Sequence, residues 1–526
     1  MKTSISKLFT LKRLALVLFA LSVWFVLSNF WSLDRKLPEQ DLWSPGLSTV
    51  DCWFDIPEGL VIECGEYQTD EIAGRFNLPF VIVRDQSEDR RSDPLVYLSG
   101  GPGNSTYIDE DNIDSWFYWL ETAKLKRDLI LLDQRGTGLS KPSYRCRAYD
   151  DYVRSALGKI VSREVEYREA LNTVQACVRE FERRGFNLSH YSSSHSARDL
   201  NSLMLALGIE QWNIIGTSYG TRLALDWLRL NERTTTESNT VSQSNIRAVI
   251  LDSIYPVDKG LLTEWPESIE KSFTYFFQAC RNQVICDEND EGLEEQFWHA
   301  ANYLKENPAE LSVPLWHGGW PVKTLVDDNR FISMIINSLY DQSAYPNIIN
   351  AIKQINSRGN KSSAGESHTE DALQILAEGM VNSELAPEFN PLIYLAIDCG
   401  EILRVEKSAY EAERAKFPAW QRYTEFAWDY DFCSAFPVRS DIDAFREPVN
   451  SDTPILVLSG GFDPVTPSAW ATDFARDKPK VNHWHLPNVG HGVSASSVCV
   501  HESLVNFLDN LNGVEPPACL AESLTQ

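Results

Sequence analysis

Short apolar runs alternate with helical patterns along most of this chain. Apolar positions recur at helical spacing in 164–184 and 197–207. We expect strands at residues 79–83, 95–98, 129–132, 212–215, 248–251, 455–458 and 483–486. Strands that alternate with helices predict a mainly parallel central sheet covered by helices on both faces.

The alternation pauses between about residues 259 and 440. This region has helical patterns, is rich in Trp, Tyr and Phe, and contains a polar break at 357–368. We expect a mostly helical cap, inserted between a first part of an α/β core at 49–258 and a second part at 441–526. The aromatic cap should line an apolar substrate pocket, and the polar stretch 234–245 should be a surface loop.

The first residues are typical of a targeting signal. An apolar run at about 14–31 follows four basic residues, Lys2, Lys7, Lys12 and Arg13. This charge pattern directs export and leaves the N-terminus inside. An uncleaved signal anchor within 1–31 is favoured over a cleaved signal peptide, because bulky residues stand where a cleavage site needs small ones. After a linker at 32–48, the chain should lie in the periplasm, on the extracytoplasmic face of the membrane, or be secreted.

The ten cysteines agree with export, because all of them follow the apolar run. An exported chain with an even number of cysteines is expected to form disulfides. Spacing alone leaves the pairing open, and no Cys-x-x-Cys or Cys/His cluster indicates a zinc site. The simplest connectivity joins neighbours: Cys52–Cys64, Cys146–Cys177, Cys280–Cys286, Cys399–Cys433 and Cys499–Cys519.

Composition narrows the class of partner. The 526 residues are 43% hydrophobic and 23% charged, as in an ordinary globular protein, and the net charge is −26. This negative charge argues against nucleic acid and an anionic membrane surface as main partners.

The stretch Gly216-Thr217-Ser218-Tyr219-Gly220 stands between a predicted strand and a helical pattern. A Gly-x-Ser-x-Gly turn in this setting is typical of a nucleophile elbow, in which a backbone-strained serine presents its Oγ. Side chains in place of the two glycines would collide with neighbouring strands. We therefore predict Ser218 as a nucleophile, and an ordinary glycine-rich turn is the alternative.

A serine nucleophile needs a base, and the base needs an acid that fixes its tautomer. Asp463 and His491 each follow a late predicted strand, at the edge where α/β sheets place their sites. The order Ser218, Asp463, His491 is that of α/β-hydrolases. Asp252, after the strand 248–251, is the rival acid, and Asp463 is favoured because its loop is rich in turn residues.

A second glycine-rich loop, Ser99-Gly100-Gly101-Pro102-Gly103, follows the predicted strand 95–98. Its glycines let the backbone approach a substrate, whereas proline has no N–H to donate. We assign the oxyanion donors to the backbone N–H groups of Gly101 and Tyr219. A plain turn is the alternative for this loop.

Two other features receive a structural interpretation. The loop 133–140 should hold a buried pair of its own Asp133 and Arg135. His483 and His485 lie on a predicted strand and should have structural roles there.

Together these motifs resemble those of the proline iminopeptidase and tripeptidyl aminopeptidase family of α/β-hydrolases. The late Cys499 and Cys519 resemble the C-terminal region of tripeptidyl aminopeptidases. The resemblance spans about residues 50–520, and it implies the α/β-hydrolase fold and an exopeptidase that releases residues from a free N-terminus. The matching stretches, in the family order, are 100–103, 133–140, 216–222, 461–467 and 490–492.

The resemblance also raises two questions about the pocket. Ser99 stands where many relatives have His before the glycines, which should alter the pocket and leave the backbone donors in place. An acidic group should bind the α-ammonium group of the substrate. Glu401, in the stretch 397–401, is the candidate, and Glu264 and Glu267 are rivals. A solvated or salt-bridged glutamate is the alternative for each.

We therefore expect an exported serine aminopeptidase that cleaves peptides with a free N-terminus and needs no metal or organic cofactor. A carboxylesterase or lipase with the same triad is the alternative enzyme. A non-catalytic binding protein on a hydrolase fold is the alternative of another class. Ser218 at the elbow disfavours epoxide hydrolase and dehalogenase chemistry, which uses an aspartate there.

Overall fold

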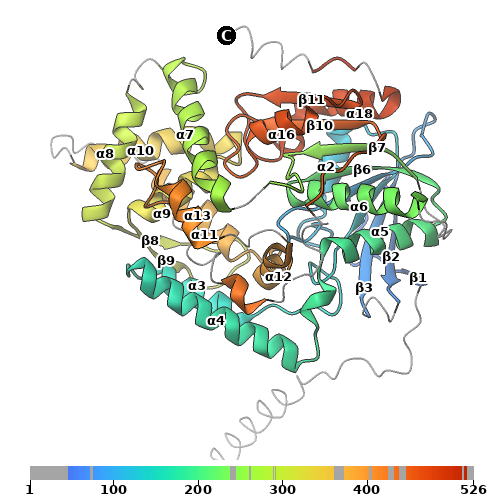
Figure 1. Ribbon diagram of the computed structural model, residues 1–526, viewed down its shortest axis with the longest axis horizontal. Helices are drawn as coiled ribbons and strands as arrows, with labels where there is room; N and C mark the ends of the chain where they lie inside the picture. The colour runs from blue at the N-terminus through green and yellow to red at the C-terminus, as the bar shows by residue number, and fades with distance from the viewer. Residues whose placement is uncertain are drawn as a thin grey trace, which may run out of the picture. The chain divides into compact units, whose positions relative to one another are not determined.

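The computed structural model of the protein is drawn in Figure 1. The predicted signal segment and most of the predicted linker lie outside the described residues, and positions 46–48 of that linker belong to the first strand, β1 (Gly46–Val50). Among the described helices, none is both long and apolar enough to cross a bilayer. The structure describes residues 46–70, 75–236, 245–259, 262–287, 290, 292–359, 372–401, 406–424, 432–436, 446–511 and 514–517.

In the described part of the chain, nine strands form one central sheet in the order β1-β2-β3-β5-β4-β6-β7-β10-β11 (Figure 1). At one side, β1, β2 (Val61–Gln68), β3 (Asn77–Arg84) and β5 (Leu129–Leu132) pair antiparallel. From β5 onward all neighbours are parallel. The parallel strands that follow are β4 (Leu95–Leu98), β6 (Gln211–Thr217), β7 (Asn245–Asp252), β10 (Ile455–Gly460) and β11 (Val481–Leu486).

The seven predicted strands all coincide with strands of this sheet, so the expected mainly parallel α/β architecture is confirmed. The sequence pattern did not identify β1 and β2. They form an antiparallel border that carries fewer uninterrupted apolar residues.

The apolar runs of the sheet are explained by burial on both faces. Ile130 and Leu132 pack into a cluster with α4 (Arg163–Arg183), α5 (Ser193–Ala206) and α6 (Tyr219–Thr236). Leu129 and Leu131 point the other way, into a cluster with α2 (Asp114–Ala123) and α18 (His501–Asn510). Successive strand residues face opposite sides, so a strand covered on both faces is apolar throughout. The two predicted helices correspond to α4 and α5.

Between β7 and β10 the chain builds a third apolar cluster, rich in phenylalanine. The antiparallel hairpin in this region was missed, because its strands are short and largely polar. The elements of the cluster are α7 (Trp265–Arg281), α8 (Leu293–Glu306), β8 (Ala309–Val313), β9 (Val322–Val326), α9 (Asp328–Ser338), α10 (Tyr345–Gly359) and α11 (Ala372–Glu384).

The next helix, α12 (Pro391–Glu401), packs with the core sheet instead of this third cluster. α13 (Lys407–Arg414) follows, and α16 (Ser468–Ala475) and α17 (Val493–Ser496) belong to the last part of the chain. After its first 44 residues the chain forms one compact unit. The predicted domain boundaries after 258 and 440 therefore stay a proposal.

Four disulfides join sequence neighbours. One ties the start of α3 (Arg147–Leu157) to α4, and another ties α12 to the short helix η6 (Cys433–Ala435). Cys499 is also disulfide-bonded, while Cys519 lies outside the described residues. Disulfides in this number are typical of proteins outside the cytoplasm. The four pairs are Cys52–Cys64, Cys146–Cys177, Cys280–Cys286 and Cys399–Cys433.

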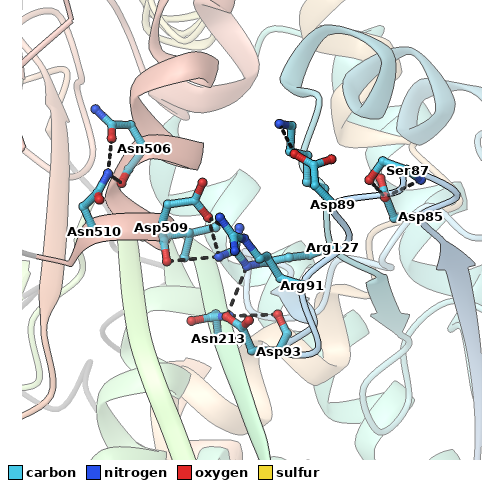
Figure 2. Close-up of polar contacts among 12 residues, drawn as sticks. Asp85, Ser87, Asp89, Arg91, Asp93, Arg127, Asn213, Asn506, Asp509 and Asn510 are labelled. Atoms are coloured by element: carbon cyan, nitrogen blue, oxygen red, sulfur yellow. Dashed lines mark hydrogen bonds and ion pairs between the residues drawn. The ribbon is translucent and has the colours of Figure 1, made fainter.

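A buried ion-pair network lies at the amino-terminal edge of the parallel strands (Figure 2). The Arg127 side chain is 1% exposed, and its guanidinium contacts Asp93 at 3.1 Å and Asp509 at 2.7 Å. Asn213 of β6 donates its Nδ2 to the same Asp93 carboxylate at 2.7 Å. Because Asp509 belongs to α18, this network fastens the last helix to the central strands.

Candidate active site

Ser218 lies in the turn between β6 and α6, and its φ of +57° is in the left-handed region that non-glycine residues rarely occupy. A Cβ on Gly216 would overlap the Gly220 carbonyl, and a Cβ on Gly220 would overlap the carbonyl of Leu98 in β4. Only glycine fits at both positions, so the strained turn is enforced by packing. Ser218 is among the residues that line a cavity beside this turn.

The structure brings Asp463 and His491 into direct contact. Nδ1 of His491 lies 2.8 Å from Oδ2 of Asp463, a carboxylate that is 1% exposed. Thr466 donates its N–H to Oδ1 at 2.8 Å and its hydroxyl to Oδ2 at 2.6 Å. An ionised carboxylate can only accept, so Nδ1 carries the imidazole proton and Nε2 is left to accept another.

The pKa values of this pair move apart. Burial by itself would raise the pKa of Asp463, but the His491 ring and the Thr466 donors outweigh it and lower the pKa. Burial would lower the pKa of His491, but the Asp463 carboxylate outweighs it and raises the pKa. The charged form of each group is therefore stabilised by the other.

The end of β7 holds the serine turn and the histidine loop together. The carbonyl of Asp252 accepts the Ser218 N–H at 2.9 Å. Its carboxylate accepts the N–H groups of Val493 and Ser494, each at 2.8 Å, directly after the histidine loop. The rival acid Asp252 is thus occupied by backbone donors of α17, whereas the contact to Nδ1 of His491 is made by Asp463.

The two residues predicted to donate to the oxyanion belong to segments next to the serine. A Cβ built on Gly100 would stand 3.1 Å from Cβ and 3.6 Å from Oγ of Ser218, so the glycine-rich loop passes directly beside the side chain. Gly101 lines the same cavity as Ser218. Tyr219 is the first residue of α6, where backbone N–H groups have no acceptor within the helix. The positive end of the helix dipole also favours an anion there.

Ser99 is hydrogen-bonded behind this loop and is not among the residues that line the cavity. Its hydroxyl donates to the carbonyl of Asn104 at 3.2 Å and accepts from Nε2 of Gln134 at 3.1 Å. It is 1% exposed. The departure from the family pattern at this position therefore changes the packing under the loop rather than the pocket wall.

The predicted pair of Asp133 and Arg135 is wrong. Asp133 accepts the backbone N–H groups of Thr106 and Leu139, each at 2.7 Å, and burial raises its pKa to about 7. Arg135 donates to Asp199 of α5 at 2.7 Å instead. Asp133 and Arg135 are two residues apart in a tight loop, and their side chains bind different partners. The structural role expected for the loop is nevertheless the one observed.

His483 and His485 lie away from the cavity, on β11. Nε2 of His483 and Nδ1 of His485 lie 2.8 Å and 3.2 Å from the hydroxyl of Ser459. Burial lowers the pKa of His483 to about 4. These residues form a hydrogen-bonded cluster on the sheet, in line with the structural interpretation.

The cavity beside Ser218 has a volume of about 1010 Å³. Nine aromatic side chains line it, as the cap composition suggested, but so do five carboxylates, and no Lys or Arg is among its described lining residues. The expected apolar pocket is therefore also an acidic one. The five carboxylates are Asp341, Glu378, Glu384, Glu388 and Asp398.

None of the three predicted amine-binding glutamates is among the residues that line this cavity. Glu401 is fully buried and accepts the Ser193 N–H at 2.9 Å and the Ser193 hydroxyl at 2.7 Å. Glu264 pairs with Lys259 at 3.5 Å, and Glu267 with Lys271 at 2.6 Å.

Asp398, which the sequence reasoning passed over, is the cavity residue of the stretch that suggested Glu401. The two lie almost one turn apart on α12. Asp398 shares its helix face with Tyr394, another lining residue, while Glu401 turns toward Ser193. Glu388 lies three residues before the start of α12. Its backbone carbonyl accepts the N–H of Ser105, just after the glycine-rich loop, at 2.8 Å. Helical spacing could have indicated Asp398, whereas no local pattern marks Glu388.

In the residues that the structure describes, no group of three or more His, Cys, Asp or Glu side chains is arranged to hold a metal ion.

Two family models match the chain. One, described as alpha/beta hydrolase fold, covers residues 93–331 and includes Ser218, and one described as TAP-like protein covers 419–516 and includes Asp463 and His491. The tripeptidyl aminopeptidase of Streptomyces coelicolor is 24% identical over 449 residues, which is 80% of this chain and 73% of the relative. The serine protease Hip1 of Mycobacterium tuberculosis is 29% identical over 461 residues, 81% of this chain and 79% of the relative. A solved proline iminopeptidase from Mycobacterium smegmatis covers 85% of this chain and 98% of its own, at 14% identity and a TM-score of 0.36.

Proposed function

The chain belongs to the α/β-hydrolase family and carries a TAP-like C-terminal region, and from this premise we propose that it is an exported serine aminopeptidase. The observation that carries the proposal is the strained Ser218 in an aromatic cavity whose ionised side chains are carboxylates. Such a wall attracts the positive charge of a peptide N-terminus. Relatives named as a tripeptidyl aminopeptidase and a serine protease support a peptide as the substrate.

In the proposed mechanism Ser218 Oγ attacks a peptide carbonyl near the substrate N-terminus. Nε2 of His491 takes the hydroxyl proton, and Asp463 at 2.8 Å holds the imidazole in the required tautomer. The negative charge on the tetrahedral intermediate is accepted by the N–H groups of Gly101 and Tyr219.

Collapse of the intermediate expels the rest of the peptide as an amine, which receives its proton from His491. This leaves the N-terminal fragment bound to Ser218 as an ester. Water, activated by the same histidine, then attacks the ester, and the fragment leaves with a new carboxyl group.

Selection of a free N-terminus is assigned to Asp398. The Asp398 residue is 3% exposed. Burial raises the pKa of Tyr219, the residue after Ser218, and the charges of Glu401 and Asp398 raise it further. Asp398 therefore lies near the nucleophile turn. A buried carboxylate at this short reach would hold an ammonium group a fixed number of residues from the nucleophile. Glu388, which also lines the cavity, is the second candidate.

The cavity volume of about 1010 Å³ favours a short peptide over a single residue as the bound fragment. It lies at the upper limit of ordinary ligand pockets, which measure about 300 to 1,000 Å³. Release of a fragment of up to three residues is therefore proposed.

Export is supported by two independent features. The basic residues and apolar run at 1–31 have the pattern of a signal segment. The disulfides require an oxidising compartment to form and persist. Together they support a location in the periplasm, at the extracytoplasmic face of the membrane, or outside the cell.

A substrate panel with the full-length protein tests the proposal. It contains aminoacyl and tripeptidyl p-nitroanilides with a free N-terminus, their N-acetylated counterparts, and simple esters. We expect the free peptides to be cleaved, and acetylation to lower kcat/KM by about 100-fold or more, because it removes the ammonium charge. Ser218→Ala should lower kcat by at least about 10³-fold with an unchanged circular dichroism spectrum. Cleavage of esters and acetylated amides alone would instead identify an esterase.

The same panel locates the ammonium site. Asp398→Asn should raise KM for free peptides by about tenfold or more and leave the residual cleavage of acetylated ones unchanged. The control, Glu411→Gln, removes a carboxylate on α13 that is 56% exposed and pairs with Lys407. Equal effects of Asp398→Asn on free and acetylated substrates would reject its assignment.

A further inference from the structure

The cap side of the cavity carries more negative charge than one ammonium group requires. Besides Asp398 and Glu388, three further carboxylates line the cavity. Asp341 lies between α9 and α10, and Glu378 and Glu384 lie on α11. Other residues of α11, including Gly379 and Asn382, also line the cavity at helical spacing, so this helix forms a continuous part of the wall.

These three carboxylates have no cationic partner among the residues that the structure describes. Asp341 accepts the N–H and hydroxyl of Ser343 at 2.9 and 2.8 Å, and Glu378 accepts Nε2 of Gln374 at 2.9 Å. All of these donors are neutral. Within the described part of the chain no Lys, Arg or His forms an ion pair with any of the three, while Glu388 has His317 at 3.4 Å. Asp341 and the α11 residues that line the cavity, here called the cap wall, therefore carry negative charge that no cation among the described residues compensates. Burial raises the pKa of Glu384, so Asp341 and Glu378 are the main sources of this charge.

A tryptophan held against α11 is a second feature that suits a cation. Trp316, at the tip of the β8–β9 hairpin, lines the cavity and is 68% exposed. The backbone N–H of Trp316 donates to Oδ1 of Asn382 at 2.8 Å, and Nδ2 of Asn382 donates to the Pro314 carbonyl at 3.0 Å. This clamp fixes the hairpin tip against α11. A cation between a carboxylate and an aromatic ring is attracted by both.

We propose that the cavity selects substrates with a lysine or arginine side chain inside the N-terminal fragment that it binds. One carboxylate suffices for the substrate ammonium, so the cap carboxylates are available for a side-chain cation. Their negative charge should equally reject aspartate and glutamate in the fragment. This inference rests on the proposed peptidase function, whose substrate class it narrows.

Matched substrates test the inference directly. Lysine and norleucine have side chains of nearly equal length, and lysine adds the charge. With the wild-type full-length protein at low ionic strength, kcat/KM should be about tenfold higher for lysine at one or more fragment positions. Glutamate should be about tenfold worse than its neutral isostere glutamine. The lysine advantage should shrink in 0.5 M NaCl, because salt screens the charges.

Variants then assign the preference to the cap wall. Glu378→Gln, Glu384→Gln and Asp341→Asn each remove one charge from the cavity, and at least one should reduce the lysine-to-norleucine ratio about threefold or more. In each variant kcat/KM should fall less for the norleucine substrate than for the lysine substrate, and an unchanged circular dichroism spectrum shows that the fold is intact. The matched control is Glu310→Gln on β8, whose carboxylate is 63% exposed and pairs with Lys323 outside the cavity.

The outcomes separate this inference from the proposed function. Free peptides cleaved with equal or better rates for norleucine would overturn the charge preference and leave the peptidase assignment intact. A lysine preference unchanged in all three variants would also overturn the role of the cap wall. Failure to cleave any free peptide would reject the peptidase assignment itself.

Discussion

At the scale of single residues, the pair of Asp463 and His491 is organised by donors that reach the carboxylate from its own loop. Val465 and Thr466 donate their N–H groups to Oδ1 at 3.0 and 2.8 Å, and the Thr466 hydroxyl donates to Oδ2. These bonds keep the buried aspartate ionised and point Oδ2 at the imidazole. The orientation of the base thus depends on a short loop of the protein.

The pH dependence of kcat/KM should report the pKa of His491. A general base works unprotonated, so activity falls as pH drops through that pKa. Since the pKa is raised above its ordinary value of 6.5, the acid limb of the profile should have its midpoint above pH 6.5. Asp463→Asn removes the charge that raises it, so the midpoint should move to lower pH and kcat should fall about 10⁴-fold.

A pH–rate profile of both proteins, with substrate groups that do not titrate between pH 5 and 9, makes the comparison. A wild-type midpoint at or below pH 6.5 would contradict the coupling of the two side chains. A midpoint that Asp463→Asn does not move would assign the acid limb to a different group.

At the scale of elements, the carboxyl end of β7 aligns two segments that lie far apart in the sequence. Its last residue binds the serine turn through its carbonyl and α17 through its carboxylate. The Ser253 hydroxyl accepts the Gly492 N–H at 2.8 Å, directly after His491. The spacing between the proposed nucleophile and base is therefore set by a strand that contributes no catalytic group.

Asp252→Ala should destabilise the protein by about 2 to 4 kcal/mol. It leaves two backbone N–H groups and the Ser494 hydroxyl without their buried acceptor. The free energy of unfolding, measured in urea, gives the result. Asp473→Asn, at an exposed pair with Arg476, is the control and should change it by less than about 0.5 kcal/mol. An equal change in both proteins would show that the acceptor role of Asp252 contributes little.

At the scale of the whole molecule, the two edges of the parallel sheet have different roles. The carboxyl edge holds Ser218, Asp463 and His491, as expected for an open α/β sheet. The amino edge holds the network around Arg127, which joins loops before β4 and β5 to the last helix. The candidate catalytic residues and the ion pairs that anchor α18 thus lie at opposite ends of the parallel strands.

Arg127→Ala should lower the free energy of unfolding by about 3 kcal/mol, because it leaves Asp93 and Asp509 without their buried guanidinium. Arg91 supplies a matched control, since it approaches the same Asp509 at 3.6 Å but is 52% exposed (Figure 2). Arg91→Ala should cost less than about 0.5 kcal/mol. Urea unfolding followed by tryptophan fluorescence compares the two, and a larger loss for Arg91→Ala would refute the anchoring role.

How far the sequence predicted the site depended on whether each signal was local. The elbow around Ser218 and the loops of Asp463 and His491 were found because turn residues follow apolar runs at those points. The partner of Arg135 was missed, because Asp199 lies 64 residues away along the chain, in α5. The cavity carboxylates were also missed, since Glu388 and Asp398 come to line the cavity beside Ser218 only when α12 and the segment before it pack on the core.

The sequence by itself determined seven of the nine strands described in the central sheet, the order of the candidate catalytic residues and the strained serine turn. Each of these follows from apolar periodicity or from steric limits that act over a few residues. Only the tertiary structure decided which acid contacts His491, which carboxylates face the cavity, and that Glu401 is held by Ser193. Charged side chains take partners wherever folding removes water, and the burial of a position depends on segments that are distant along the chain.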